Sequence, residues 1–351
     1  MGASDADFAT RVVRWQSRHG RNDLPWQTLR DPYRVWLSEI MLQQTQVVTV
    51  KAYFTRFVER FPDVASLAAA SLDDVLGLWS GLGYYSRARN LHRCAQALVL
   101  HHGGAFPRDA QTLTTLPGIG RSTAAAIASL CFSERVAILD ANVKRVVSRV
   151  TGFDADVAVA ANARALWDAA TGLLPAEKRA VQDMARYTQG MMDLGALVCT
   201  PKKPGCSECP VQVDCRAAFA GDPERYPVRS RKLRRSSQSI WLLWVETEWG
   251  DVWLGRRPTP GVWAGLYCLP LFESEQALLD AVPAYARAQV QVAPAFLHVL
   301  THKDLHLHVG RVRLPAGAMR EDASGEGRWV SSGDWPVLGL PAPVRKILER
   351  G

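Results

Sequence analysis

A change in hydrophobic patterning near residue 235 limits most strongly what this chain can fold into. Before that point apolar residues recur at helical spacing, and strand-type alternation is nearly absent. After it, short runs rich in β-branched and aromatic residues are separated by turn residues. A chain of 351 residues also suggests more than one domain. We therefore predict an all-α domain followed by an α+β domain, with boundaries at 1–225, a basic linker at 226–236, and 237–351.

In the first half, apolar spacing predicts helices over 7–19, Tyr33–Val50, Arg121–Leu130 and two runs within 160–198 that divide at Pro175. Between 51 and 115 we expect further helices, broken at Pro62, Gly77, 81–83, Gly103–Gly104 and Pro107. The predicted buried stripe of the second helix is Trp36, Leu37, Ile40, Met41, Val47 and Val48.

Glu39 lies inside this stripe. At positions i, i+4 and i+7, Glu39, Gln43 and Gln46 would share one face of a continuous helix. A helical Glu is usually solvated, and that interpretation stays open. Partial burial among Trp, Leu, Ile and Met side chains would instead raise its pKa, which suits a general acid.

The stretch from Leu116 to Asp140 combines a Pro-Gly-Ile-Gly turn with an Ala-rich helix. The helix N-terminus after such a turn can bind phosphate, or the segment can be a plain helix–turn–helix corner. A nucleotide-binding loop fits less well, because Thr123 replaces the third glycine and no strand precedes the turn. Asp140 precedes a helical run, which predicts an N-cap, and a capping carboxylate can also face a cleft.

Charge favours a polyanionic partner. The net charge is +8, and the sequence pI is about 9.3. The segment Tyr84–Arg93 places aromatics beside arginines, and 229–235 is a basic run. Both suit a nucleic acid. A Tyr pair at a core edge with a solvated basic face explains the first equally well, and most basic linkers are merely solvated. Lys144, Arg145 and Arg149 add positive charge.

No apolar run is long enough to span a membrane, and the N-terminus lacks a signal core, so we expect a cytoplasmic protein without a membrane partner. Disulfides are then not expected, yet Cys199, Cys206, Cys209 and Cys215 cluster with gaps of six, two and five residues. This spacing favours an iron–sulfur cluster over zinc, which remains the alternative. Cys94, Cys131 and Cys268 lie in apolar contexts and are expected to be buried thiols.

The second half predicts a strand pair over 239–257 around a turn at Trp249–Asp251. Further strands are expected at 295–300, 305–313 and 327–330. In the second of these, apolar residues alternate with His306 and His308, as in a half-buried strand. Helices are expected at 274–288 and 342–350.

Several motifs together resemble the MutY-type adenine DNA glycosylases, of the helix-hairpin-helix superfamily related to endonuclease III. They are LPWQ, VWLSEIMLQQTQV, LWSGLGYYSRARNLH, LPGIGRSTA, ILDANVKRV, MMDLGA and the four spaced cysteines. The resemblance covers nearly the whole chain. It implies a helix-hairpin-helix glycosylase domain with an iron–sulfur loop, a Nudix-like second domain, and release of adenine mispaired with 8-oxoguanine or guanine in double-stranded DNA. It also implies a [4Fe–4S] cluster on the four cysteines, and we expect a monomer.

Carried over to this sequence, the resemblance makes Glu39 the catalytic acid and Asp140 the essential aspartate. Gly118 and Gly120 would hold backbone phosphate, and Gln44 and Tyr84 would wedge into the duplex. The expected substrate- and DNA-binding residues are Trp26, Leu42, Gln43, Gln44, Tyr84, Gly118, Gly120, Ser122, Asn142, Gln189, Thr301 and His302. The chain departs from the family at 187–190, where YTQG replaces the frequent FNQA.

One position decides between relatives. In endonuclease III-like lyases a catalytic lysine follows the hairpin, whereas this chain has Ser122, which implies a monofunctional glycosylase. The Nudix metal signature is absent after 270, so the second domain is expected to read the lesion strand through Thr301 and His302. A bifunctional glycosylase/lyase and a non-catalytic DNA-binding protein are the alternative functions.

Overall fold

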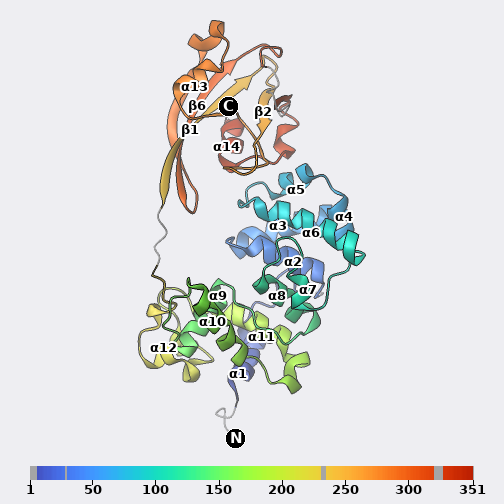
Figure 1. Ribbon diagram of the computed structural model, residues 1–351, viewed down its shortest axis with the longest axis vertical. Helices are drawn as coiled ribbons and strands as arrows, with labels where there is room; N and C mark the ends of the chain where they lie inside the picture. The colour runs from blue at the N-terminus through green and yellow to red at the C-terminus, as the bar shows by residue number, and fades with distance from the viewer. Residues whose placement is uncertain (1–5, 28–29, 231–234, 320–326, 351) are drawn as a thin grey trace. The chain divides into compact units, whose positions relative to one another are not determined.

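The computed structural model describes residues 6–27, 30–230, 235–319 and 327–350. The chain divides into two compact units, which Figure 1 shows in colours that follow the sequence. The helical unit comprises 1–69 and 90–232, and the sheet unit comprises 70–89 and 233–351. The sheet unit therefore includes a segment from the middle of the helical half. The domain boundaries expected from sequence remain a prediction.

The helical unit is built almost wholly from helices, as the apolar spacing predicts. Its described helices are α1 (Phe8–His19), α2 (Pro32–Leu42), α3 (Val47–Arg60), α4 (Val64–Ala69), the larger part of α6 (Ser86–His102), α7 (Ala110–Leu113), α8 (Arg121–Phe132), α9 (Ala141–Thr151), α10 (Ala160–Gly172), α11 (Glu177–Leu197) and α12 (Arg216–Phe219). The long helix α11 lies against α1, α8 and α9, and its Met184 and Leu194 are fully buried. Burial of this apolar face fixes the connection between α8 and α9, which carries Asp140.

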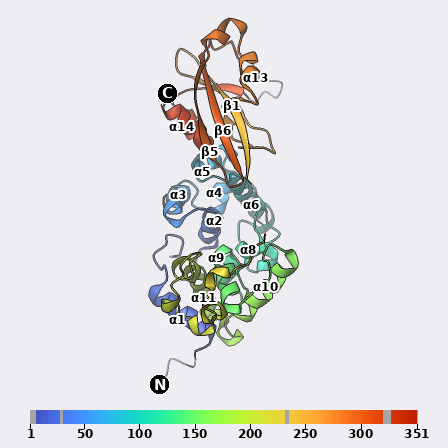
Figure 2. The same cartoon turned by 90° about the vertical axis from the view of Figure 1, so that its left-hand side faces the viewer.

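The sheet unit contains a mixed sheet with strand order β3-β2-β1-β6-β5. The strands are β1 (Ser236–Glu246), β2 (Val252–Arg256), β3 (Tyr267–Cys268), β4 (Leu271–Phe272), β5 (Gln291–Val299), β6 (Lys303–Arg313) and β7 (Gly327–Val330). The predicted hairpin between β1 and β2 is confirmed, with Glu246 opposite Val252. β1 and β6 pair in parallel, and Figure 2 shows the two long strands side by side.

The two faces of this sheet bury different helices. Ile240 and Leu242 face a core that includes Val344 of α14 (Ala342–Arg350). Leu243 and Val245 face the opposite core, which includes Leu278 of α13 (Glu275–Asp280). Alternate residues of β1 therefore serve both layers, which explains why its sequence reads as a continuous apolar run.

Residues 70–89 carry α5 (Leu72–Trp79) and the start of α6, and they pack within the sheet unit. The predicted break at Gly77 is wrong, because Gly77 lies inside α5. A Cβ at Gly77 would come within 2.2 Å of the carbonyl oxygen of Val337, so only glycine permits this close approach. The guanidinium of Arg256 also donates to both carboxylate oxygens of Asp73, each at 2.7 Å.

The predicted helix Tyr33–Val50 is interrupted. α2 ends at Leu42 and α3 begins at Val47, while Gln44 has a left-handed φ of 57°. Gln43 and Gln46 therefore do not continue the helical face of Glu39. Val48, expected in the buried stripe, is 84% exposed.

The helix expected over 274–288 is also interrupted. α13 ends at Asp280, and a 3₁₀ helix, Ala284–Gln289, follows Pro283. Proline lacks an N–H and restricts the residue before it, which explains the break.

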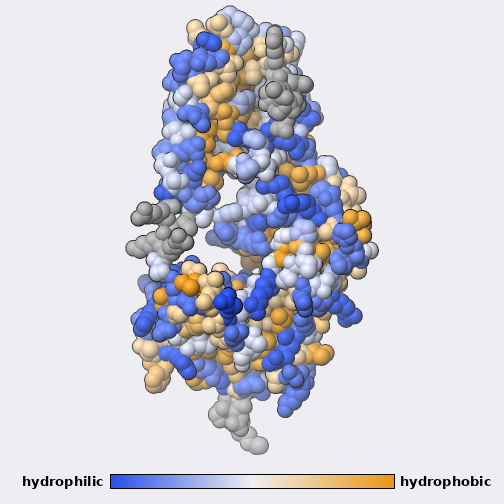
Figure 3. Space-filling view, in the orientation of Figure 1, coloured by the Kyte–Doolittle hydropathy of each residue, from blue (hydrophilic) through white to orange (hydrophobic). Residues whose placement is uncertain are grey.

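In the described part of the chain, no helix combines the length and apolar character needed to cross a membrane. Polar side chains cover much of the visible face of both units, with apolar patches between them (Figure 3). Four residues of the predicted basic linker, 231–234, lie outside the described residues.

Candidate functional site

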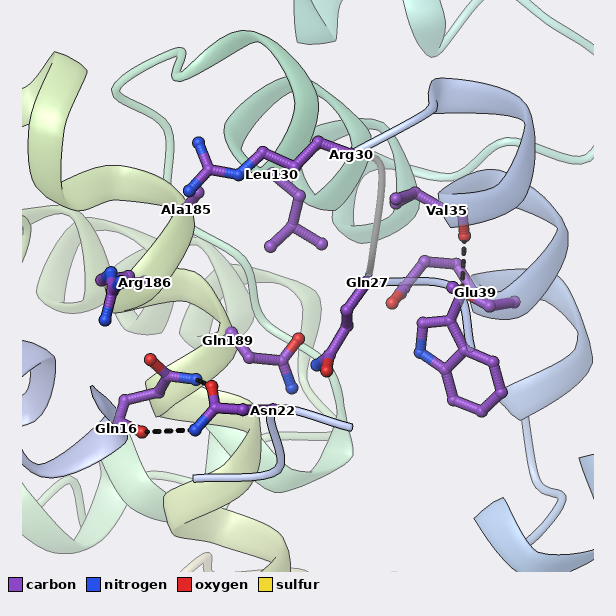
Figure 4. Close-up of a pocket in the computed structure, with 12 residues that line it drawn as sticks. Gln16, Asn22, Gln27, Arg30, Val35, Glu39, Leu130, Ala185, Arg186 and Gln189 are labelled. Carbon is purple, nitrogen blue, oxygen red and sulfur yellow. Dashed lines mark hydrogen bonds between the residues drawn. The ribbon is translucent and has the colours of Figure 1, made fainter. Parts of the chain in front are cut away.

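A cavity in the helical unit gathers residues from α1, α2, α8, α11 and the loop before α2. Figure 4 shows the polar side chains converging around it. Its walls are formed by Gln16, Asn22, Trp26, Gln27, Arg30, Val35, Ser38, Glu39, Leu130, Ala185, Arg186 and Gln189. Three residues singled out from the sequence, Trp26, Glu39 and Gln189, thus line one cavity. Trp26 is buried and packs edge-on against Phe54, with ring centroids 5.3 Å apart.

Glu39 is the carboxyl group of this cavity. It lies on α2 between residues that are buried in the core, and its side chain faces the cavity. Burial raises the pKa of Glu39 to about 7, and the nearby charge of Asp140 contributes to this rise. Glu39 can therefore be protonated near neutral pH, as a general acid must be. Of the two interpretations of its sequence context, the structure supports partial burial.

Asp140 is the N-cap of α9, as the sequence predicts, and its carboxylate accepts a hydrogen bond from the backbone N–H of Val143 at 2.7 Å. It does not belong to the cavity wall. Burial raises its pKa, and the backbone N–H groups of Val143 and Asn142 oppose that shift. Ser122 fixes the approach to Asp140, because its hydroxyl accepts from the N–H of Leu139 at 3.1 Å.

The turn before α8 has the predicted glycine geometry. Gly118 has a left-handed φ of 76°, and a Cβ there would lie 2.5 Å from the Cβ of Asn90. Gly120 is the N-cap of α8 and has open space around its Cα. Both the conformation and the close packing at Gly118 require glycine, and the first turn of α8 is left with unpaired N–H groups.

The break after α2 places two candidate residues at the surface. Leu42, the last residue of α2, is partly buried, whereas Gln43 and Gln44 are exposed. Gln44 belongs to the helical unit and Tyr84 to the sheet unit.

The four clustered cysteines line a second cavity of the helical unit, together with Arg149. Burial raises the pKa of Cys209 to about 12, and the other three cysteines add to this shift. Crowded thiolates of this kind need a positive centre, and four thiolates suit a [4Fe–4S] cluster. Among the residues the structure describes, no group of three or more His, Cys, Asp or Glu side chains is arranged so that it could hold a single metal ion. The fit to a cluster rests on the shared cavity and on the all-thiol donor set.

Two arginines of α9 hold this cysteine loop, which the sequence did not reveal. Arg149 is 1% exposed, and its guanidinium donates to Cys199 Sγ at 3.3 Å and to the carbonyl of Thr200 at 2.7 Å. Arg145 donates to the carbonyl oxygen of Cys199 and to the side-chain oxygen of Asn142. They lie four residues apart and so share one face of α9. Both guanidinium groups therefore bind groups inside the protein.

The other cysteines agree with expectation in part. Cys94 and Cys268 are buried, but Cys131 is only partly buried. It lies near the C-terminal end of α8, where the helix leaves the core.

The sheet unit has a cavity of its own. It is lined by Leu82, Gly83, Tyr84, Tyr85, Ser86, Arg89, Gly261, Val262, Trp263, Ala264, Val299, Leu300, Thr301 and His302. The loop before α6 thus meets the turn between β5 and β6, and the hydroxyls of Tyr84 and Thr301 hydrogen-bond. Thr301 and His302 are exposed.

Arg87 and Arg89 support this loop. Arg87 is buried, lies over the rings of Trp79 and Tyr84, and donates to the carbonyl of Gly83. Arg89 donates to the carbonyl of Ala264 at 2.6 Å. Both guanidinium groups therefore bind groups within the protein, which differs from the solvated basic face expected as the structural alternative.

Comparisons with known proteins agree with this architecture. Residues 37–169 match the family described as HhH-GPD superfamily base excision DNA repair protein, and residues 240–350 match the NUDIX domain. The chain is 35% identical to the adenine DNA glycosylase of Buchnera aphidicola subsp. Acyrthosiphon pisum (strain APS), over 97% of each chain. It is 46% identical to the adenine DNA glycosylase of Mus musculus, over 60% of this chain and 41% of the mouse protein.

A solved thermostable thymine-DNA glycosylase superposes on 61% of this chain and 95% of its own, with a TM-score of 0.53 and 27% identity. The helical fold, the second domain and the similarity along nearly the full chain all point to one family. The chain belongs to the adenine DNA glycosylases, DNA repair enzymes of the helix-hairpin-helix superfamily with a Nudix-like C-terminal domain.

Proposed function

We propose that this enzyme binds double-stranded DNA and hydrolyses adenine mispaired with 8-oxoguanine or guanine, leaving an abasic site without cutting the strand. One observation carries the proposal. The Glu39 carboxyl group faces a cavity, its pKa is raised to about 7, and it lies close enough to Asp140 for the two charges to interact. Two carboxyl groups with opposed protonation states can release a sugar-bound leaving group.

The base must leave the duplex before Glu39 can reach it, at a cost of about a few kcal/mol. The cavity walls offer a flat apolar surface, Trp26, and polar groups that can orient a purine. In this cavity protonated Glu39 donates to N7 of adenine, which makes the base a better leaving group. The carboxylate that remains can then activate water.

Asp140 supplies the negative charge for the sugar. As the bond to adenine breaks, the sugar becomes an oxocarbenium-like cation, which an ionised carboxylate stabilises by charge or by a transient bond. The cap hydrogen bond from Val143 holds one carboxylate oxygen of Asp140 in place. The rest of its carboxylate is left to act on the sugar.

Ser122 supports the monofunctional reaction. A lyase needs an amine that attacks the sugar, and this position carries a hydroxyl that already accepts a hydrogen bond from Leu139 N–H. We propose that the turn at Gly118 and Gly120 binds backbone phosphate, and that Leu42, Gln43, Gln44 and Tyr84 contact the duplex.

We assign recognition of the base opposite adenine to the cavity of the sheet unit. Thr301 and His302 lie at its edge beside Tyr84. 8-Oxoguanine differs from guanine by an acceptor at O8 and a donor at N7, which a hydroxyl or an imidazole can distinguish.

We propose a structural [4Fe–4S] cluster on Cys199, Cys206, Cys209 and Cys215. Its chemistry would be to hold the loop through four iron–thiolate bonds. Arg145 and Arg149 position Cys199 for it.

A duplex assay tests the proposal. The substrate carries adenine opposite 8-oxoguanine, and products are read with and without alkali. Strand cleavage only after alkali is the expected result. Cleavage without alkali would identify a lyase, and no cleavage under either condition would identify a non-catalytic DNA-binding protein.

A further inference from the structure

The Glu39 cavity lies toward one end of the two helices that flank it. α2 contributes Val35, Ser38 and Glu39 from its N-terminal and middle turns, and α8 contributes Leu130 from its last turn. From the first turn of α8 to Leu130 the chain advances by about 12 Å, since each helical residue rises by about 1.5 Å. The cavity therefore reaches well away from the N-terminal end of α8.

The groups proposed to meet DNA lie at the opposite helix ends. The turn at 118–120 immediately precedes α8, and 42–44 close α2 and follow it. Asp140, proposed to act on the sugar, follows Leu139, whose N–H donates to Ser122 Oγ in the first turn of α8 at 3.1 Å. The sugar is thus expected at the N-terminal end of α8, and the cavity extends from there away from the duplex.

Three exposed residues line the part of the cavity that reaches solvent, namely Asn22, Arg30 and Arg186. Arg30 comes just before the N-cap of α2, a helix of 11 residues and about 16 Å, so it lies at the other end of α2 from Leu42. Figure 4 shows Arg186 across the cavity from Glu39. We call this opening, defined by Asn22, Arg30 and Arg186, the remote mouth.

The cavity behind the remote mouth has room for solvent. Its volume is about 180 Å³, and one water molecule needs about 10–15 Å³ of such space and two to four polar partners. Gln27, Ser38 and Gln189 place polar groups in the wall. Several water molecules can therefore occupy the cavity up to the Glu39 carboxyl group.

The proposed reaction needs two occupants of one space in turn. Glu39 first gives its proton to adenine N7 as the bond between the base and the sugar breaks. The same carboxylate then takes a proton from water as the water oxygen bonds to the sugar, which yields adenine and an abasic site. Both events take place between Glu39 and the sugar. Adenine must leave this space before water can enter it, while the duplex still covers the way in.

We propose that the remote mouth is the route by which free adenine leaves and water enters while the abasic duplex stays bound. This inference rests on the proposed hydrolysis of adenine in this cavity and adds an order of product release, with the base before the DNA. The residues of the remote mouth suit this traffic. A guanidinium plane can stack on a flat purine, and the Asn22 amide can exchange hydrogen bonds with it.

The test follows adenine and DNA separately after one turnover. The duplex carries radiolabelled adenine opposite 8-oxoguanine, and the enzyme is in excess. Rapid ultrafiltration, without denaturation, separates free adenine from the protein–DNA complex, and alkali treatment of a parallel sample counts the abasic sites formed. In the wild type, adenine in the filtrate should keep pace with abasic sites while the duplex remains bound to the protein.

Two substitutions of Leu130 change the width of the passage in opposite directions. Leu130 is only partly buried, so the indole of Leu130→Trp can extend into the cavity without displacing the core. In this variant adenine should reach the filtrate about tenfold more slowly, or only as the duplex dissociates. Leu130→Ala widens the same place and should release adenine at least as fast as the wild type.

Leu100→Trp is the matched control, because Leu100 of α6 is 76% exposed and does not line the cavity. It should behave as the wild type does. Wild-type adenine that stays with the complex until the duplex dissociates would overturn the inference, as would unslowed release by Leu130→Trp. If Leu130→Trp forms no abasic sites, the wild-type measurement decides alone. Failure of the proposed function looks different, because the wild type would then form no alkali-labile sites at all.

Discussion

The hydroxyl groups of Tyr84 and Thr301 form a hydrogen bond across 217 residues of sequence. Tyr84 has a left-handed φ of 48°, and Thr301 lies in the turn between β5 and β6. The C-terminal domain therefore contacts the loop that precedes α6, a loop that the sequence assigned to the helical domain. A residue proposed to wedge into the duplex and one proposed to read the lesion are thus part of one polar contact.

Thr301→Val should weaken the discrimination between 8-oxoguanine and guanine opposite adenine. The valine keeps the shape of threonine but removes the hydroxyl, so Tyr84 and the lesion both lose a partner. We expect the ratio of adenine release rates from the two duplexes to fall by about tenfold, or ~1.4 kcal/mol. Thr301→Ser is the control and should retain most of the preference. Equal ratios in all three proteins would assign lesion reading elsewhere.

This contact also bears on truncation. The sheet unit includes 70–89, held by the Asp73–Arg256 pair and by the close approach at Gly77. Removing the C-terminal domain would leave α5 without these contacts. Point variants therefore test the second domain more cleanly than a deletion does.

The rate of adenine release should depend on pH through Glu39. Its pKa is raised to about 7, so the acid is protonated below that pH and the rate should fall as pH rises through about 7. Asp140 must be ionised, and burial raises its pKa, so the rate should also decline toward acid pH. Glu39→Gln should be nearly inactive and lose the alkaline limb. A wild-type alkaline limb in that variant would contradict the role of Glu39.

Glu39→Gln should also change stability with pH. The carboxyl has a pKa of about 7 when folded against a model value of 4.5, so its protonated form is favoured by folding. Its contribution to the free energy of unfolding is present below pH 4.5 and is lost as pH rises toward 7. Glutamine does not titrate, so the variant should gain up to about 3 kcal/mol on the wild type by about pH 8. Urea unfolding at about pH 4.5 and about pH 8 measures the difference. A gap independent of pH would show an unshifted carboxyl.

Asp140→Asn separates the cap from the charge. Asn is as good an N-cap as Asp, so the bond from Val143 N–H and the stability of α9 should survive. Duplex binding should persist, while adenine release should be lost because the charge is gone. Asp140→Ala should lose activity and also about 1 kcal/mol of stability. Near-normal release by Asp140→Asn would reduce Asp140 to a cap.

The cysteine loop should contain iron. Protein purified without oxygen is expected to be brown, with about four irons per chain. Arg149→Met removes the hydrogen bonds to Cys199 Sγ and to the carbonyls of Thr200, Pro201 and Pro223, so iron content should fall. Arg164→Met, at an exposed position of α10, should retain iron. Zinc without iron in the wild type would overturn the cluster, and full iron in Arg149→Met would overturn the role of that arginine.

The sequence determined much of this protein by local rules. Helical spacing located α1, α8, α10 and α11, and period-two alternation located β6, because each element buries one face. Asp140 was recognised as an N-cap, and Gly118 as a residue with special backbone geometry. These features depend on a few neighbours in the chain, which a sequence displays directly.

Only the tertiary structure decided the rest. The helix breaks after Leu42 without a proline or glycine nearby, so no local sequence signal predicts the break. The sequence predicts a helix break at Gly77, but the structure shows that a glycine is needed there because the backbone of Val337 approaches it closely. Arg149 was counted among the charges that favour a polyanionic partner, yet it is buried, and so is Asp193. Burying a charge is favourable only when distant groups supply its hydrogen bonds, and those partners lie in other segments of the chain.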